Sequence, residues 1–141
     1  MINVKDLPPV KANKVMYGDT LIELASAHPE LVVLDADVGK STGTLQFRDA
    51  YPDRYINVGI AEQNMIGMAA GMATCGKLAF AATFVVFTSM RAVEQLRNAV
   101  CYPNLNVKVA GTHSGLETGE DGATHQAIED MAIVRSIPNI R

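Results

Sequence analysis

The strongest constraint on the fold is the regular alternation of short apolar runs with longer segments of helical pattern. Residues 31–34 are apolar without interruption, which is typical of a strand buried on both faces. Similar runs predict strands at residues 55–58, 78–83 and 105–110, and helices are expected at about 20–28, 62–75, 88–100 and 127–136. Strands that alternate with helices form right-handed βαβ units, so we expect an α/β fold: three layers, α/β/α, around a mainly parallel sheet.

The sequence predicts a short N-terminal arm followed by a single domain. Residues 1–17 are of mixed character and contain Pro8 and Pro9, so they are predicted to form an irregular N-terminal arm. Residues 18–141 have the size of one domain, with polar loops expected at 35–47 and 111–124. Residues 137–141 look like the entry to another strand, which suggests a fragment or one chain of a divided protein.

The composition argues against several classes of partner. The formal net charge is only −3 and the sequence has no basic stripe, which disfavours binding to nucleic acid. Polar residues interrupt the longest apolar stretches, so no membrane span is predicted. Cys75 and Cys101 lie outside any metal-ligand spacing, and with no signal peptide in view we expect a cytoplasmic protein.

The predicted helix at 62–75 begins with a carboxylate. Glu62 lies in its first turn, just after a predicted strand, and the helix is apolar on every side, so we expect burial all round. A glutamate at this place commonly stabilises the helix N-terminus, where free N–H groups favour negative charge. The alternative is that Glu62 points at a ligand in a crevice beyond the sheet.

Further polar and aromatic side chains follow the other predicted strands. Ligands bind at the carboxyl ends of the strands in open parallel sheets, so residues there are candidates. Each also has an ordinary explanation as a turn, core or surface residue. These candidates are Asp35, Asp37, Ser41, Phe84, Phe87, His113, Glu120, Asp121 and His125. In contrast, Arg91 is expected on the outward face of an amphipathic helix.

Familiar catalytic motifs are missing from the sequence. The turn after the first predicted strand reads Asp35-Ala36-Asp37-Val38-Gly39-Lys40, without the G-x-G-x-x-G of dinucleotide folds. The sequence also lacks a P-loop, a G-x-S-x-G nucleophile elbow and an H-E-x-x-H metal helix.

Three separated motifs together resemble the pyrimidine-binding, central domain of transketolase. They are Gly59-Ile60-Ala61-Glu62-Gln63-Asn64, Thr83-Phe84-Val85-Val86-Phe87 and Gly119-Glu120-Asp121-Gly122-Ala123-Thr124-His125-Gln126. Their order and spacing match over nearly the whole chain, and the likeness is greatest to the C-terminal subunit of a split transketolase, truncated before its last domain. The resemblance implies a thiamine diphosphate-dependent transfer of a two-carbon ketol unit between sugar phosphates, in the pentose phosphate pathway.

The resemblance also implies a role for each candidate. Glu62 matches the glutamate that hydrogen-bonds N1′ of the cofactor's aminopyrimidine. Phe87 matches the aromatic residue that stacks on that ring, Phe84 lines the same pocket, and Asp37 matches an aspartate near the thiazolium. Substrate-binding roles fall to Ser41 and His113 near the sugar phosphate and to Asp121 at a substrate hydroxyl. His125 matches a catalytic histidine near the reacting carbon, whereas Met90 replaces a third aromatic residue found in many members.

Members of this family hold the cofactor's diphosphate through Mg²⁺ or Ca²⁺, with a Gly-Asp-Gly motif that this sequence lacks. We therefore expect no metal site in this chain, an active site shared with a pyrophosphate-binding domain or subunit, and a homo-oligomer. Alone, the chain is expected to be inactive. Related alternatives are deoxyxylulose-phosphate synthase and the β-chain of a 2-oxo acid dehydrogenase. More distant alternatives are a non-catalytic interaction module and a flavodoxin-like binder.

Overall fold

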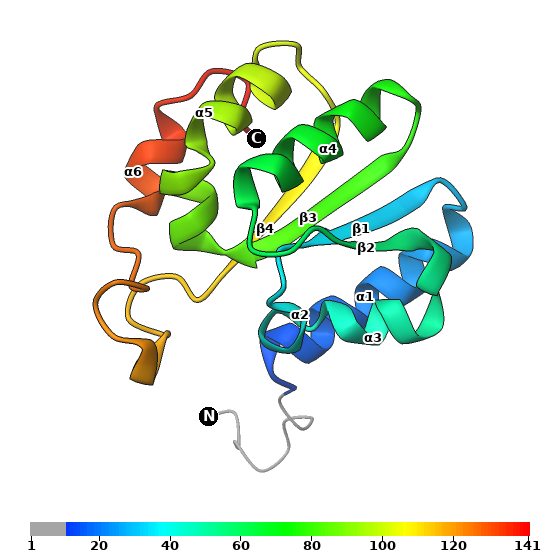
Figure 1. Cartoon of the computed structure of the whole chain (residues 1–141), viewed down its shortest axis with the longest axis horizontal. Helices are drawn as coiled ribbons and strands as arrows, with labels where there is room; N and C mark the ends of the chain where they lie inside the picture. Colours follow the sequence, from blue (N-terminus) through cyan, green and yellow to red (C-terminus); the bar gives the residue numbers. More distant parts are fainter. Residues whose placement is uncertain (1–10) are drawn as a thin grey trace, which may run out of the picture.

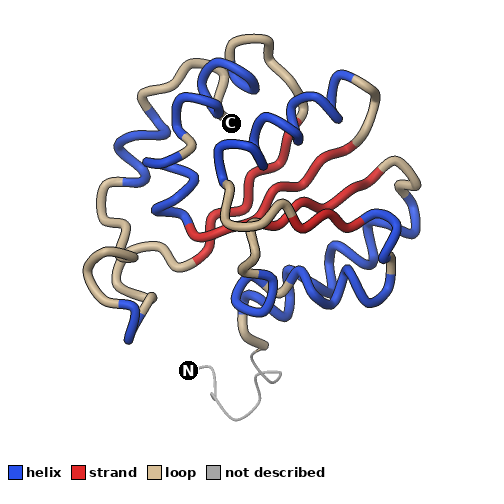
Figure 2. The backbone as a smooth tube through the Cα atoms, viewed as in Figure 1, coloured by secondary structure: helices blue, strands red, loops and turns tan. Residues whose placement is uncertain are grey.

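The sheet is parallel throughout and has four strands in the order β2-β1-β3-β4. In the computed structural model, which describes residues 11–141, these are β1 (Leu31–Asp35), β2 (Tyr55–Asn57), β3 (Leu78–Phe84) and β4 (Val107–Thr112). The register pairs Asp35 with Asn57 on one side and with Ala82 on the other. Figure 2 shows the strands lying side by side between two layers of helix, and each neighbouring pair is parallel. The α/β fold with helices around a parallel sheet is therefore confirmed.

The two faces of β1 explain why helices cover both sides of the sheet. Leu31 and Val33 pack into a cluster with residues of α1 (Asn13–Ala27) and α3 (Thr44–Ala50), including Leu21 and Phe47. Val32 and Leu34, which point the other way, belong to the larger cluster. That cluster includes residues of α4 (Glu62–Thr74) and of the helical segment built from a π-helical turn (Phe87–Arg91), α5 (Val93–Gln95) and a second π-helical stretch (Leu96–Cys101). Figure 1 shows these helices on opposite sides of the sheet.

The N-terminal region differs from the sequence prediction. Helix α1 begins at Asn13, not near Thr20, so residues 13–17 are helical where irregular chain was expected. Tyr17 and Leu21, one turn apart, both join the cluster that covers β1, and this packing holds the first turns of the helix in place. Residues 1–10 lie outside the described part of the chain. The division into an arm at 1–17 and a domain at 18–141 stays a prediction.

The segment between β1 and β2 is helical, not the polar loop that was expected. It contains α2 (Gly39–Thr42), α3 and a 3₁₀ turn (Pro52–Arg54). Gly43, with φ of +86°, separates α2 from α3, and a Cβ there would collide with the backbone of Lys14 in α1. The prediction of a loop was wrong because it took polar residues to be exposed. Thr42 and Thr44 are fully buried, and their hydroxyls donate hydrogen bonds to the buried carboxylate of Asp35 instead of to water.

Helix α4 is also less enclosed than its composition predicted. Its inner face buries Met65, Ile66 and Ala69, but Gly67 and Gly71 are exposed, and the space where their side chains would lie is open. The expectation of burial all round is therefore wrong for the described chain. The apolar pattern was ambiguous on this face because glycine counts as apolar without contributing a side chain that must be buried.

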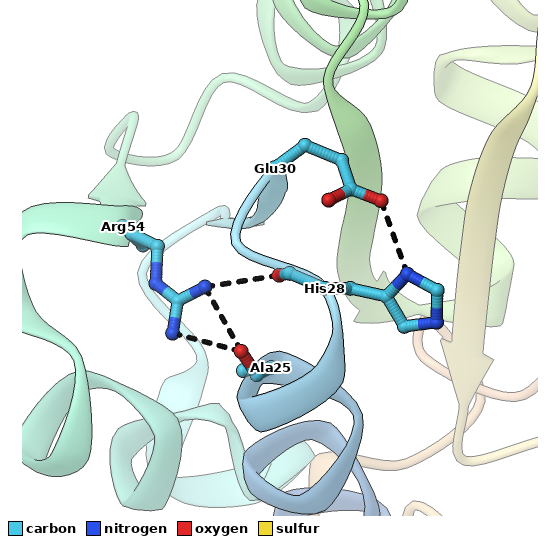
Figure 3. Close-up of polar contacts among 4 residues, drawn as sticks. All are labelled: Ala25, His28, Glu30 and Arg54. Carbon is cyan, nitrogen blue, oxygen red and sulfur yellow. Dashed lines mark hydrogen bonds and ion pairs between the residues drawn. The ribbon is translucent and has the colours of Figure 1, made fainter.

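Arg54 joins the end of α1 to the start of β2. Its guanidinium donates hydrogen bonds to the carbonyl oxygens of Ala25 and His28, at N···O distances of 3.0–3.2 Å (Figure 3). The carbonyl groups in the last turn of a helix have no partner within it, and the dipole favours a cation there. Close by, the His28 ring pairs with the Glu30 carboxylate at 3.0 Å. The pKa of Glu30 is lowered, first by a backbone hydrogen bond and then by His28.

The remaining elements complete the C-terminal third. A 3₁₀ turn (Gly119–Asp121) lies in the long loop after β4, and α6 (Asp130–Arg135) is shorter than the helix expected at 127–136. Within this loop Gly115 and Ala127 form an isolated antiparallel bridge, which closes the loop and returns residue 125 toward the sheet.

Candidate functional site

Asp35, the last residue of β1, anchors the segment that carries Asp37 and Ser41. Its carboxylate is fully buried and accepts hydrogen bonds from the Val38 N–H at 2.8 Å and from the hydroxyls of Thr44 and Thr42 at 2.8 and 3.1 Å. Three donors compensate for removing the carboxylate from water. Asp35 therefore has the turn-forming role that was one of its two interpretations.

Asp37 lies at the carboxyl edge of the sheet, in a left-handed conformation with φ of +64°. Its carboxylate accepts a hydrogen bond from Nδ2 of the Asn57 side chain at 2.8 Å, and Oδ1 of the same side chain accepts one from the Gly59 N–H. These bonds join the ends of β1 and β2 to the turn before Glu62. Asp37 also lines a cavity of about 620 Å³ together with Lys40 and Tyr55.

Glu62 is the first residue of α4 and is only 2% exposed. Its carboxylate accepts two hydrogen bonds from one nitrogen, Nη1 of Arg91, which lies 3.0 Å from Oε1 and 3.0 Å from Oε2. The helix N-terminus and the guanidinium both stabilise the negative charge. The carboxylate is thus fixed beyond the end of β2, and its partner, Arg91, was not predicted from the sequence.

Arg91 was expected to face outward, and that expectation is wrong for its charged group. Half of the side chain is exposed, but the guanidinium bonds to Glu62 and its Cζ lies 4.5 Å from the centroid of the Phe87 ring. The reason is local geometry. Phe87–Arg91 forms a π-helical turn, whose wider spacing rotates side chains away from the positions that an α-helical pattern predicts.

Four rings gather beside this ion pair. Phe84 and Phe87 are stacked with centroids 5.9 Å apart and planes 6° apart, and His113 stacks on Phe84 at 4.1 Å. His125 meets both phenylalanines edge-on, at 5.4 Å from Phe87 and 6.2 Å from Phe84. β3 supplies Phe84, and the loop after β4 brings both histidines back to it. Flat aromatic surfaces with nearby ring nitrogens suit a flat heteroaromatic ligand.

Threonine hydroxyls orient both histidines. Nδ1 of His113 lies 2.8 Å from the Thr112 hydroxyl, and Nδ1 of His125 lies 2.9 Å from the Thr124 hydroxyl. His113 has φ of +58°, a conformation uncommon for a residue with a side chain. Each histidine therefore keeps its Nε2 for another partner.

The predicted residues divide into two groups. Glu62, Phe84, Phe87, His113 and His125 are connected in one cluster through Arg91 and the ring contacts. Asp37 lies at the neighbouring strand ends, linked to Asn57. Ser41 lies in α2, and Asp121 is exposed in the 3₁₀ turn of the long loop. Among residues 11–141, neither makes a side-chain hydrogen bond to the cluster.

The described residues were expected to hold neither a metal site nor a membrane-spanning helix. Within residues 11–141, no three His, Cys, Asp or Glu side chains come together as a set of metal ligands. Over the same range, no helix combines the length and the apolar character that a membrane crossing requires.

Comparison with known proteins gives consistent matches. Residues 11–141 match the family described as transketolase, pyrimidine binding domain. A protein of Methanocaldococcus jannaschii, provisionally named a transketolase C-terminal section, is 58% identical over 124 residues, covering 88% of this chain and 39% of that protein. A 1-deoxy-D-xylulose-5-phosphate synthase of Thermomicrobium roseum is 39% identical over 140 residues, covering 99% of this chain and 22% of the synthase.

A solved structure agrees with these relatives. A chain described as a split gene transketolase, in an inactive β4 tetramer, is 55% identical with a TM-score of 0.75, over 87% of this chain and 39% of that chain. The chain described here thus spans only part of the length of each relative. Because the family match covers the entire described sequence, the chain belongs to the transketolase family, as its pyrimidine-binding domain.

Proposed function

We propose that this chain supplies the pyrimidine-binding half of a thiamine diphosphate-dependent transketolase. The proposed reaction transfers a two-carbon ketol unit between sugar phosphates. One observation carries the proposal: a carboxylate that is 2% exposed, at the start of α4, shares a guanidinium partner with the aromatic ring of Phe87. A buried carboxylate acceptor and an aromatic face are the two contacts that suit an aminopyrimidine ring, which has a nitrogen to be hydrogen-bonded and a flat surface to be stacked.

The described residues fit that cofactor. When bound, thiamine diphosphate supplies the carbon chemistry of ketol transfer. Glu62 holds a hydrogen bond to the ring nitrogen, Phe87 stacks on the ring, and Phe84 excludes water from the pocket. His125, oriented by Thr124, moves a proton at the reacting substrate through its Nε2.

The substrate roles fall to residues around the cluster. His113 and Ser41 bind the sugar phosphate, and Asp121 accepts a hydrogen bond from a substrate hydroxyl. Asp37 contributes at the edge shared by cofactor and partner. The hydrogen bond from Asn57 supports this role of Asp37, because Asn57 also accepts a hydrogen bond from Gly59 in the turn before Glu62.

We further propose that a second domain or subunit completes the site. That partner binds the diphosphate through Mg²⁺ or Ca²⁺, so the chain alone is inactive, and the assembly is a homo-oligomer of such pairs. The exposed glycine face of α4 and the side chain of Ile60, 78% exposed beside Glu62, support docking at this edge. A related split gene transketolase chain forms an inactive β4 tetramer, which agrees with a need for another chain.

The assay that tests the reaction uses the chain reconstituted with its pyrophosphate-binding companion. A ketose phosphate donor with an aldose phosphate acceptor should give ketol transfer. Replacing Glu62 by Gln should lower kcat/KM by roughly 100-fold or more while the fold is retained. The matched control, Glu23→Gln on the exposed side of α1, should leave turnover unchanged. Near-normal turnover in the Glu62 variant would instead indicate a non-catalytic, capping role.

A second candidate function is deoxyxylulose-phosphate synthesis, which the 39% identity to a synthase supports. The same reconstituted complex separates the two reactions. Condensation of pyruvate with glyceraldehyde phosphate, without ketol transfer, would reverse the order of the two proposals.

A further inference from the structure

The guanidinium of Arg91 contacts both the Glu62 carboxylate and the Phe87 ring. It therefore occupies the place where a ligand of these two side chains would lie. Nη1 donates to both oxygens of Glu62 at 3.0 Å, and Cζ lies 4.5 Å from the centroid of the Phe87 ring. A single nitrogen at equal distances from both oxygens lies midway between them, on the side of the carboxylate that the guanidinium occupies. A ligand that approaches the carboxylate from the same direction meets the guanidinium first.

The chemistry of this group resembles that of the ring proposed to bind here. A guanidinium is planar and delocalised, donates N–H groups to carboxylates and stacks on aromatic faces. An aminopyrimidine protonated at N1′ is also planar and delocalised, and it presents a single ring N–H to a carboxylate, with its amino group on the opposite side of the ring. Both species would satisfy the same pair of side chains, Glu62 and Phe87.

The burial of the two partners indicates which one moves. The Glu62 side chain is only 3% exposed and is fixed at the start of α4, whereas half of the Arg91 side chain is exposed. Water can solvate the guanidinium outside the site at small cost, because ion pairs with an exposed partner contribute little. Glu62 has no comparable route to solvent, so a rearrangement on ligand binding is a movement of Arg91.

We infer that Arg91 is an internal stand-in for the cofactor's pyrimidine, occupying the Glu62 carboxylate and the Phe87 face until the ring displaces it. The inference rests on the proposed function. It makes Arg91 a competitor of the cofactor and assigns it no step in the reaction. The ion pair also keeps the buried carboxylate partnered while the pocket holds no ring, which protects the empty domain from an uncompensated charge.

The test is the binding of thiamine diphosphate, with Mg²⁺, to the reconstituted complex, measured by titration calorimetry. Because the cofactor no longer displaces a guanidinium, Arg91→Met should tighten the dissociation constant roughly tenfold. Arg91→Lys keeps the charge but loses the planar group, and should tighten binding less. Arg97→Met is the matched control, since Arg97 is exposed and, among residues 11–141, its side chain donates only to Asn98; the dissociation constant of this variant should not change.

The results separate this inference from the proposed function. Unchanged or weaker binding in Arg91→Met, with a retained circular dichroism spectrum, overturns the inference and makes Arg91 a support of the pocket. Should that variant not fold, the lysine variant decides in the same way. If the wild-type complex binds no thiamine diphosphate at all, the proposed function fails and the inference falls with it.

Discussion

At the scale of single residues, the site depends on charges that are buried only where several donors meet them. Asp35 has a backbone N–H and two hydroxyls, and Glu62 has a helix N-terminus and Arg91. The two carboxylates differ in how firmly their hydrogen-bond partners are fixed. The donors of Asp35 are fixed in its own segment, which suits an anchor, whereas the partner of Glu62 is half exposed and can leave, which suits a binding group.

Tyr17 presents the opposite case, a buried hydroxyl without a partner among residues 11–141. Burial, and next the charge of Asp35, raises the pKa of Tyr17 well above its usual value near 10. The unfolded chain therefore loses this proton before the folded chain does. The free energy of unfolding therefore falls as the pH rises above about 10, because the folded chain must keep a proton that the unfolded chain has released.

We predict that Tyr17→Phe raises the free energy of unfolding at pH 7 by about 1 kcal/mol, because it removes a buried, unpaired hydroxyl. The loss of stability between about pH 10 and pH 11 should also become shallower than in the wild type. Urea unfolding across this range measures both effects. Tyr102→Phe, at a side chain that is 85% exposed, is the control and should change neither. A destabilised Tyr17 variant would mean that the hydroxyl has a partner.

The residue types of the site could be predicted from the sequence, but the connections between them could not. Glu62, Phe87 and His125 follow predicted strand ends, where parallel sheets gather their ligands. Arg91 was missed because a π-helical turn has no recognisable sequence pattern and shifts the facing of its side chains. The sequence showed only that Arg91, a charged residue, follows Phe87 by four positions, and an α-helical pattern predicts that such a residue faces outward.

At the scale of elements, the packing of α1 and α3 fixes the start of β2, at the end of the strands opposite the candidate site. Arg54 contributes by binding the carbonyl oxygens at the end of α1 (Figure 3). It also lies over the Tyr51 ring, with Cζ 4.0 Å from the ring centroid. Tyr51 in turn contacts Phe47 of α3. One side chain therefore connects α1, the end of α3 and the start of β2.

We predict that Arg54→Met lowers the free energy of unfolding by about 1–2 kcal/mol, because two helix-end carbonyls lose a charged donor. Arg48→Met is the matched control. Arg48 is exposed and pairs only with its neighbour Asp49 among the described residues, so its loss should cost less than about 0.5 kcal/mol. Chemical unfolding of both variants measures the difference, and equal effects would show that the contacts of Arg54 contribute no more than a surface ion pair.

The buried strands β1 and β3 followed from the sequence because buried parallel strands have continuous apolar runs, whereas β4 lies at Val107–Thr112 and not at the predicted 105–110. Helices α2 and α3 were not predicted, because their buried threonines bond to Asp35, and a polar residue that pairs with a buried carboxylate looks like a loop residue in the sequence. The start of α1 was also missed, since packing against β1 extends the helix well before its apparent capping residues.

At the scale of the whole molecule, the candidate site lies along one edge of the sheet, and the proposed function makes it one half of a complete active site. The carboxylate, the aromatic pair and both histidines lie at the carboxyl ends of β2, β3 and β4, which Figure 1 shows meeting on one side of the fold. Residues 11–141 contain no assembled metal ligands, and the relatives are longer than this chain. We propose that Glu62 becomes functional only when a second chain or domain closes over it.

The most direct test is a titration of thiamine diphosphate and Mg²⁺ into the chain, its companion and their complex, with wild-type Glu62 and with Glu62→Gln. We predict binding by the wild-type complex and at least tenfold weaker binding by the variant complex, because the amide cannot replace the charged acceptor. The chain alone should bind weakly. Equal affinity of the two complexes, or a wild-type complex that binds no cofactor, would contradict the account.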